Sequence, residues 1–214
     1  MTSGAEPRTS VAPLEAGLRH LVRIAGAIAG SPEGQVRAIM SDALGEADPV
    51  AVEEIILQSF LFAGFPRVLN AARAWRAVSG RPAPAVDVEG SVDDFGLWRK
   101  RGEATCAIIY GDSYEKLRQN IRELHPALDE WMIVDGYGRV LSRPGVSLRA
   151  RELCVVAACA TTGQQRQLHS HLRGALNAGA SAGELGMVFD ALSDLIARDD
   201  LGRYRQLLQK VVGE

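Results

Sequence analysis

The sequence predicts an all-α protein. Ala, Leu, Arg, Glu and Gln dominate its periodic segments, and these residues favour helices. Helix start signals recur, including Asp48-Pro49 and the capping box Ser181-x-x-Glu184. The alternating β-branched and aromatic runs that are typical of strands hardly occur. Together these observations favour a bundle of short helices.

The N-terminal half is expected to begin with a loose arm, because residues 1–13 are small and polar with two prolines. Helices are predicted over 13–30, 33–46, 50–63 and 66–79. The third is predicted to start at Asp48-Pro49, with Asp48 as N-cap, and to stop at Gly64. It is apolar around most of its circumference, which predicts a helix that is buried on all sides or lies in a subunit interface.

The segment 80–91 is rich in Pro, Ala and Gly and is predicted to be a linker. After it, helices are predicted near 92–110, 113–123, 126–135, 147–161, 164–179, 182–198 and 200–212. The stretch 135–145 has three glycines and a proline, and is therefore expected to be a loop of the kind that often carries function.

A faint repeat suggests a duplicated helical unit. At an offset of 132 residues, six identities connect the two halves, for example Arg19 with Arg151 and Gln35 with Gln167. Chance matches between Ala-rich helices are the alternative. We expect one pseudo-symmetric domain over 14–214, made of an N-terminal half 14–79, the linker 80–91 and a C-terminal half 92–214.

The net charge, the cysteine pattern and the length of the apolar runs exclude several classes of partner. The net charge is −2, and no Lys/Arg run indicates nucleic-acid binding. The three cysteines form no C-x-x-C pair and are expected to be reduced, buried thiols. The longest apolar run, 153–160, is far shorter than the ~20 residues that a membrane span needs. A cytoplasmic protein is expected.

Glu152 and His171 form the most persuasive polar pair. They lie about ten residues before and eight residues after a turn at Thr162-Gly163, and so at similar heights of an antiparallel hairpin, roughly 15 Å and 12 Å from the turn. Their helix faces are otherwise apolar or uncharged, so the pair is predicted to be half-buried and suited to general acid/base chemistry. Alternatively, Glu152 is a surface residue pairing with Arg149 or Arg151, and His171 is a core histidine.

A metal site is not expected. His169 and His171 are two residues apart, and this spacing places them on different faces of a helix.

Several segments resemble the carboxymuconolactone decarboxylase family, which has an alkylhydroperoxidase-like fold. They are Glu53–Gln58, Phe62–Pro66, Tyr110-Gly-x-x-Tyr114, Asp135–Gly145, Leu148–Leu153 and His169–Gly179. The resemblance covers nearly the whole chain from about residue 14. It implies an all-helical bundle, a homotrimer or homohexamer, and sites near subunit interfaces.

The resemblance also indicates which of two branches of the family this chain is more similar to. The alkylhydroperoxidase-like branch has a C-x-x-C pair where this sequence has Gln164 and Gln167. Thiol peroxidase activity is therefore disfavoured, since no thiolate is available at that site.

The other branch implies a cofactor-free lyase of aromatic compound catabolism that acts on a small anionic lactone or carboxylic acid. Glu152 and His171 would be catalytic, and Arg143, Arg173 and Tyr137 would bind the substrate.

Three positions depart from that branch, which carries tryptophans where Tyr137 and Leu141 stand and an acidic residue at Arg139. The alternative is therefore a catalytically inactive binding or assembly module.

Overall fold

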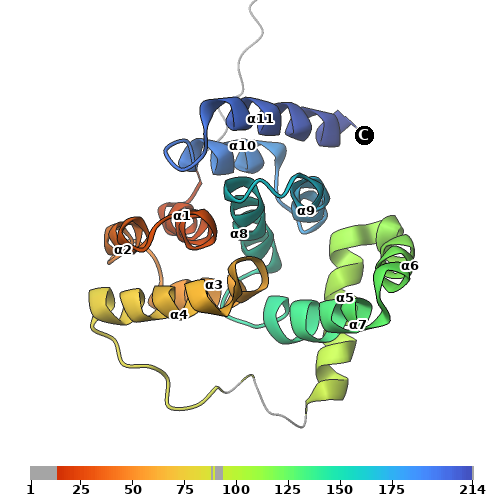
Figure 1. The fold of residues 1–214 in the computed structure, drawn as a ribbon, viewed down its shortest axis with the longest axis horizontal. Helices are drawn as coiled ribbons and strands as arrows, with labels where there is room; N and C mark the ends of the chain where they lie inside the picture. Colours follow the sequence, from red (N-terminus) through yellow and green to blue (C-terminus); the bar gives the residue numbers. More distant parts are fainter. Residues whose placement is uncertain (1–13, 88, 90–93, 214) are drawn as a thin grey trace, which may run out of the picture.

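The computed structural model describes residues 14–87, 89 and 94–213, and every regular element within these ranges is a helix (Figure 1). The predicted all-α class is confirmed. The predicted arm 1–13, the linker positions 88, 90 and 91, and the first two positions of the predicted helix 92–110 lie outside the described residues. The described part of the predicted linker is not helical.

The helices follow one another with short connections. Those of the N-terminal half are α1 (Ala16–Gly30), α2 (Glu33–Asp42), α3 (Pro49–Gln58) and α4 (Phe60–Ser79). Those of the C-terminal half are α5 (Phe95–Tyr110), the 3₁₀ turn η1 (Gly111–Ser113), α6 (Tyr114–Leu124), α7 (Pro126–Trp131), the π-helix η2 (Met132–Leu141), α8 (Leu148–Thr161), α9 (Gln165–Asn177), α10 (Ala182–Ala191) and α11 (Arg198–Gly213).

The predicted helix starts are confirmed by their side-chain caps. The Asp48 carboxylate accepts a hydrogen bond from the backbone N–H of Val50 at 3.1 Å. Ser147 caps α8 in the same way, and Ser181 and Glu184 form both bonds of a capping box at the start of α10. Each cap satisfies donors that a helix N-terminus otherwise leaves unpaired.

Helix α8 lies at the centre of the molecule, beside α1 (Figure 1). Its residues 150–160 are all buried. The Thr161 hydroxyl donates to the carbonyl oxygen of Gly26, and a Cβ at Gly26 would lie 3.2 Å from the Thr161 methyl group. A small residue therefore lets the two helices approach closely. The polar residues of α8 are held rigidly in the core as a result.

The predicted duplication agrees with the helix positions. Helices α8, α9 and α10 begin 132, 132 and 133 residues after α1, α2 and α3. The offset found in the sequence is therefore also the spacing of corresponding helices.

The predicted continuous helix over 50–63 is wrong. The chain breaks at Ser59, whose hydroxyl donates to the Ile55 carbonyl at 2.8 Å, and α4 leaves α3 at 115°. Gly64, with φ +73°, is non-helical and kinks α4 at the position where the helix was predicted to stop. The bend exposes apolar side chains, since Leu57 and Phe65 are 45% and 63% exposed. Among the described helices, only α3 and α4 taken together have the length and apolar character of a membrane span, and no single helix has both.

The loop predicted over 135–145 is also wrong for its first part. Residues 132–141 continue α7 as the buried π-helix η2, and only 142–147 form a connection. Gly138 of η2 and Gly102 of α5 let the two helices pack closely. A Cβ at Gly102 would lie 2.0 Å from the Ile133 carbonyl oxygen, and one at Gly138 would lie 2.0 Å from that of Trp98. Only glycine allows these backbones to touch.

Candidate functional site

Glu152 and His171 face each other across the α8–α9 hairpin. The Nδ1 atom of His171 lies 2.9 Å from Oε2 of Glu152, and both side chains are buried. The predicted approach is confirmed. The surface alternative is wrong, because Glu152 is fully buried while Arg149 pairs with Glu184 and Arg151 with Glu54.

A glycine makes room for the buried carboxylate. Gly174 follows His171 by three residues on α9, and a Cβ there would lie 2.8 Å from Oε2 of Glu152 and 2.5 Å from the Ile109 side chain. The other carboxylate oxygen, Oε1, is buried and has no hydrogen-bond partner within the described residues. Within the described residues, His171 is therefore the only hydrogen-bond partner of the Glu152 carboxylate.

The second ring nitrogen of His171 stays available. Nε2 forms no hydrogen bond within the described ranges and is not sealed from solvent. Phe62 and Tyr110 flank the ring edge-on, with centroids at 6.0 Å and 6.5 Å. A carboxylate on Nδ1 favours the tautomer whose proton is on Nδ1, and Nε2 can then exchange a proton with another molecule.

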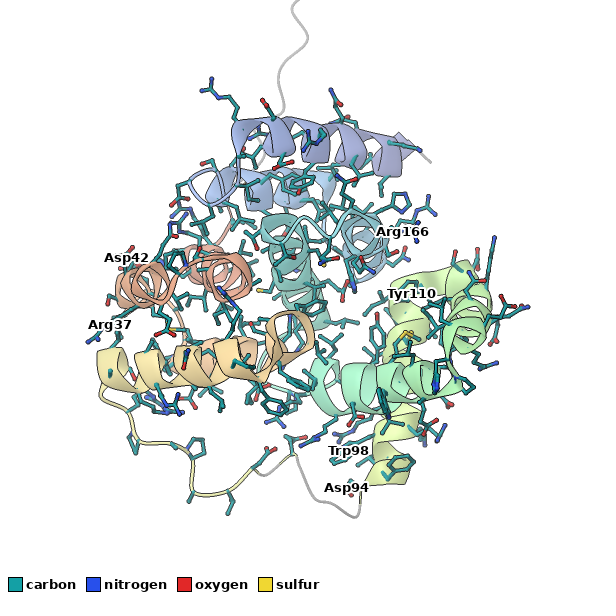
Figure 2. All side chains as sticks on the ribbon, viewed as in Figure 1. Arg37, Asp42, Asp94, Trp98, Tyr110 and Arg166 are labelled. Carbon is teal, nitrogen blue, oxygen red and sulfur yellow. The ribbon has the colours of Figure 1, made fainter. Side chains whose placement is uncertain are left out.

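Two tyrosines extend the pair. The Tyr137 hydroxyl lies 3.4 Å from that of Tyr110, and Tyr110 sits at the end of α5 that approaches α9 (Figure 2). Burial raises the pKa of Tyr110 to about 12 and that of Tyr137 well above its usual value. Both phenols therefore remain hydrogen-bond donors at neutral pH. Tyr137 was predicted at the site, whereas Tyr110 was only part of the motif Tyr110-Gly-x-x-Tyr114 and received no role.

The thiols near this cluster are neutral. The pKa of both Cys106 and Cys159 is raised to about 12, mainly by burial and with a contribution from the negative charge of Glu152. Cys154 is fully buried, with a pKa also raised to about 12. These side chains are core residues, as predicted.

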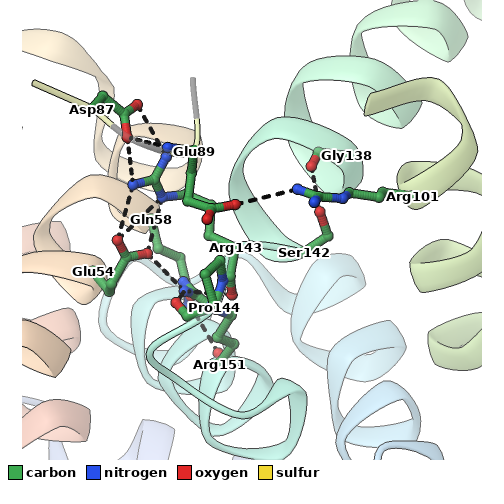
Figure 3. A network of polar contacts seen from close by, with 10 residues as sticks. All are labelled: Glu54, Gln58, Asp87, Glu89, Arg101, Gly138, Ser142, Arg143, Pro144 and Arg151. Carbon is green, nitrogen blue, oxygen red and sulfur yellow. Dashed lines mark hydrogen bonds and ion pairs between the residues drawn. The ribbon is translucent and has the colours of Figure 1, made fainter. Parts of the chain in front are cut away.

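Arg143 lies in a separate ion network. Its guanidinium binds Glu54 and Asp87, each at 3.0 Å, and Glu54 also accepts from Arg151 at 2.7 Å (Figure 3). Its donors therefore point at two carboxylates and not at His171. The structure does not bring Arg143 to the pair as the sequence suggested.

Sequence reasoning also missed the buried part of this network. Arg151 has no exposed surface, and it donates to Gln58 and to the carbonyl oxygens of Arg143 and Pro144 (Figure 3). Burial lowers the pKa of Arg151 and Glu54 opposes that effect. The network fixes the 142–147 connection to α3 and α8. The only sequence feature that marked Arg151 was its identity with Arg19 in the repeat. This identity does not indicate that Arg151 is buried.

Arg173 faces a different side of α9 from His171, since two residues span about 200° of a helix. Burial lowers the pKa of His169, and the positive charges of Arg173 and Lys210 lower it further. The charge of Arg173 therefore affects the pKa of His169. Among the described residues, no three His, Cys, Asp or Glu side chains gather as a metal site would require.

Hollows on the surface do not coincide with the pair. One of about 620 Å³ lies between α2 and α4, and one of about 250 Å³ lies where α1, α3 and the start of α8 meet. Neither is lined by Glu152, His171, Tyr110 or Tyr137.

Residues 127–195 match the family model of the carboxymuconolactone decarboxylase family. The matched segment is about a third of the chain. It contains most of α7, η2, α8, α9 and α10, and therefore Glu152, His171 and Tyr137. The predicted resemblance is confirmed.

A curated relative is similar over more of the chain. Peroxisomal protein 2 of Schizosaccharomyces pombe is 26% identical over 167 residues, which are 76% of this chain and 78% of the relative. Within the matched segment, 127–195, the cysteines are the buried Cys154 and Cys159.

Proposed function

We propose that this protein is a cofactor-free lyase that releases CO₂ from a small unsaturated carboxylated lactone or a related carboxylic acid. The observation that carries the proposal is the buried 2.9 Å hydrogen bond between Glu152 and Nδ1 of His171, which leaves Nε2 available. The match of residues 127–195 to the carboxymuconolactone decarboxylase family supports the reaction class.

The reaction divides into two steps. The bond between the substrate carbon and its carboxylate breaks, CO₂ leaves, and the electron pair is delocalised into the unsaturated lactone. His171, protonated at Nε2, then transfers its proton to carbon and is reprotonated by water. Glu152 orients the ring and stabilises its positive charge. General acid/base catalysis of this kind contributes about 10²–10⁴-fold in rate.

The tyrosines supply a donor for the developing negative charge. A neutral phenol can hydrogen-bond to the lactone oxygen that gains charge as CO₂ departs, and fixed donors of this type commonly lower the barrier by a few kcal/mol. Tyr110 is assigned this role because its ring lies beside His171, while Tyr137 holds the Tyr110 hydroxyl. Arg173, predicted to contact a substrate carboxylate, faces a different side of α9 from His171 and is given no role at this site. Arg143 is reassigned to holding the fold.

The test is CO₂ release from a panel of carboxylated lactones and β,γ-unsaturated acids, measured with purified protein and without added metal or cofactor. Saturable turnover above the uncatalysed rate on at least one member supports the lyase. Absence of turnover on every compound that binds would contradict it.

A second candidate is a binding or assembly module without catalysis. It is favoured by the neutralisation of Arg143 by Glu54 and Asp87, and by the position of the hollows away from His171. Thermal-shift screening against the same compounds separates the two. The module predicts stabilisation by ligands that are never converted.

The working form is proposed to be a homotrimer or homohexamer, because the α3–α4 corner leaves apolar side chains exposed. The sequence predicts a cytoplasmic location, whereas the name of the relative refers to the peroxisome. Fractionation of the source cells decides between them, and recovery with peroxisomal markers would contradict the cytoplasmic prediction.

A further inference from the structure

The hollow between α2 and α4 gathers positive charge. Its volume is about 620 Å³, and three arginines line it, namely Arg37, Arg67 and Arg73. The lining contains one carboxylate, that of Glu33. Figure 2 shows Arg37 between α2 and the end of α4. The side chains of the Glu152–His171 cluster do not line this hollow, so it is a separate feature.

These three arginines differ from most others in the protein. Within the described residues none of them forms an ion pair, whereas most arginines there do. Arg67 donates to backbone carbonyl oxygens at the end of α1, and Arg73 donates to the Asn70 side chain at 3.1 Å. The Arg37 guanidinium makes no hydrogen bond to a described residue. Their charges are therefore not neutralised by the chain itself.

A largely buried serine also lines the hollow. Ser31 lines the hollow and is only 7% exposed, yet its hydroxyl has no hydrogen-bond partner among the described residues. Buried polar groups in folded proteins are nearly always satisfied, by protein, water or a ligand. The hydroxyl is placed to donate to an anion that the arginines attract.

The shape of the hollow limits the ligand. About 620 Å³ lies within the range of small-molecule sites. Apolar side chains form part of the wall, including Ile28, Val36, Ala71, Ala74 and Ala77. We propose that this hollow binds a small organic anion, with carboxylate or phosphate groups held by Arg37, Arg73 and Ser31 and a carbon skeleton against the alanines of α4. Arginine suits both groups because its planar donors match two oxygens at once.

The test is isothermal titration of the full chain with citrate, a tricarboxylate, and separately with pyrophosphate, at constant ionic strength. The double variant Arg37→Gln/Arg73→Gln removes two exposed charges that make no ion pair in the described chain. Its matched control is Arg166→Gln/Arg198→Gln, which removes two exposed arginines of the same kind from α9 and α11. Circular dichroism verifies that both variants are folded.

We expect saturable binding of at least one probe, weakened at least tenfold in the hollow variant and less than twofold in the control. Glu33→Gln should tighten binding at least threefold, because it removes the one negative charge of the lining and keeps an acceptor for Asn70. The stronger probe identifies the carboxylate or the phosphate class. Equal weakening in hollow and control variants, or unchanged affinity in Glu33→Gln, would overturn the proposal. The absence of saturable binding of either probe would also overturn it.

Discussion

The backbone of Gly138 lies against the carbonyl of Trp98, so that a Cβ at position 138 would stand 2.0 Å from the Trp98 oxygen. This contact joins η2 to α5 and so fixes Tyr137 beside Tyr110. Gly138→Ala should destabilise the protein by about 2–4 kcal/mol, because the backbone itself must move. The shift in the urea unfolding midpoint measures this.

Gly136→Ala is the matched control on the same π-helix. The nearest atom to a Cβ there is the Trp131 carbonyl oxygen at 3.8 Å, an ordinary contact distance. It should change the free energy of unfolding by less than about 1 kcal/mol. Similar effects for Gly136→Ala and Gly138→Ala would show that close packing is not the reason for the glycine at 138.

Glu54 neutralises two arginines, one of which has no exposed surface. Glu54→Gln should cost about 3–5 kcal/mol, since the Arg151 charge is then buried without a counter-ion. Asp87→Asn removes only the half-exposed outer partner of Arg143 and should cost less than about 1 kcal/mol. Comparing the urea midpoints of the two variants tests the assignment, and an Asp87→Asn effect as large as that of Glu54→Gln would contradict it.

Asp129 makes part of the stability depend on pH. A hydrogen bond from Arg118 lowers the pKa of Asp129 below its usual value, against the opposing effect of burial, and Arg122 lowers it further. A carboxyl group with a lowered folded-state pKa contributes stability above its unfolded pKa of about 3.9, and that stability is lost as the pH falls through the folded value.

Asp129→Asn should therefore destabilise the protein by about 3 kcal/mol at pH 7. The difference from the unsubstituted protein should shrink as the pH falls below about 4, because Asp129 is then protonated in the unfolded state but still ionised in the folded state. The charge contribution is lost fully only below the lowered folded-state pKa. Urea unfolding at pH 7, 5, 4 and 3 measures the difference, with the exposed Asp112→Asn as control. A gap that stays constant or widens between pH 5 and pH 3 would be incompatible with this explanation.

The sequence predicted the helices and the polar pair because both depend on local rules. Caps such as Ser147 act over three residues, and the meeting of Glu152 with His171 follows from the rise per residue across one turn. The π-helix was not predictable in this way. By itself, Gly138 is typical of a loop. Its role in helix packing depends on its contact with Trp98, forty residues earlier in the chain. The Arg143 assignment failed for the same reason, since Glu54 is distant in sequence.

The exposed apolar corner between α3 and α4 predicts self-association. Leu57, Phe65 and Leu69 are 45–63% exposed there. Light scattering at micromolar concentration should give about three or six times the 23.0 kDa of one chain, and Phe65→Asp with Leu69→Asp should lower that mass. A stable species of one chain's mass would contradict the predicted trimer or hexamer.

Proton transfer by His171 is tested most directly by comparing rates of CO₂ release, on a substrate that the protein turns over, for the unsubstituted protein and His171→Gln. The substitution should lower kcat about 10²–10⁴-fold while the far-ultraviolet circular dichroism stays unchanged. Gln167→Ala, an exposed change on the same helix, should retain most of the rate. A folded His171→Gln protein that releases CO₂ at the original rate would contradict the proposal.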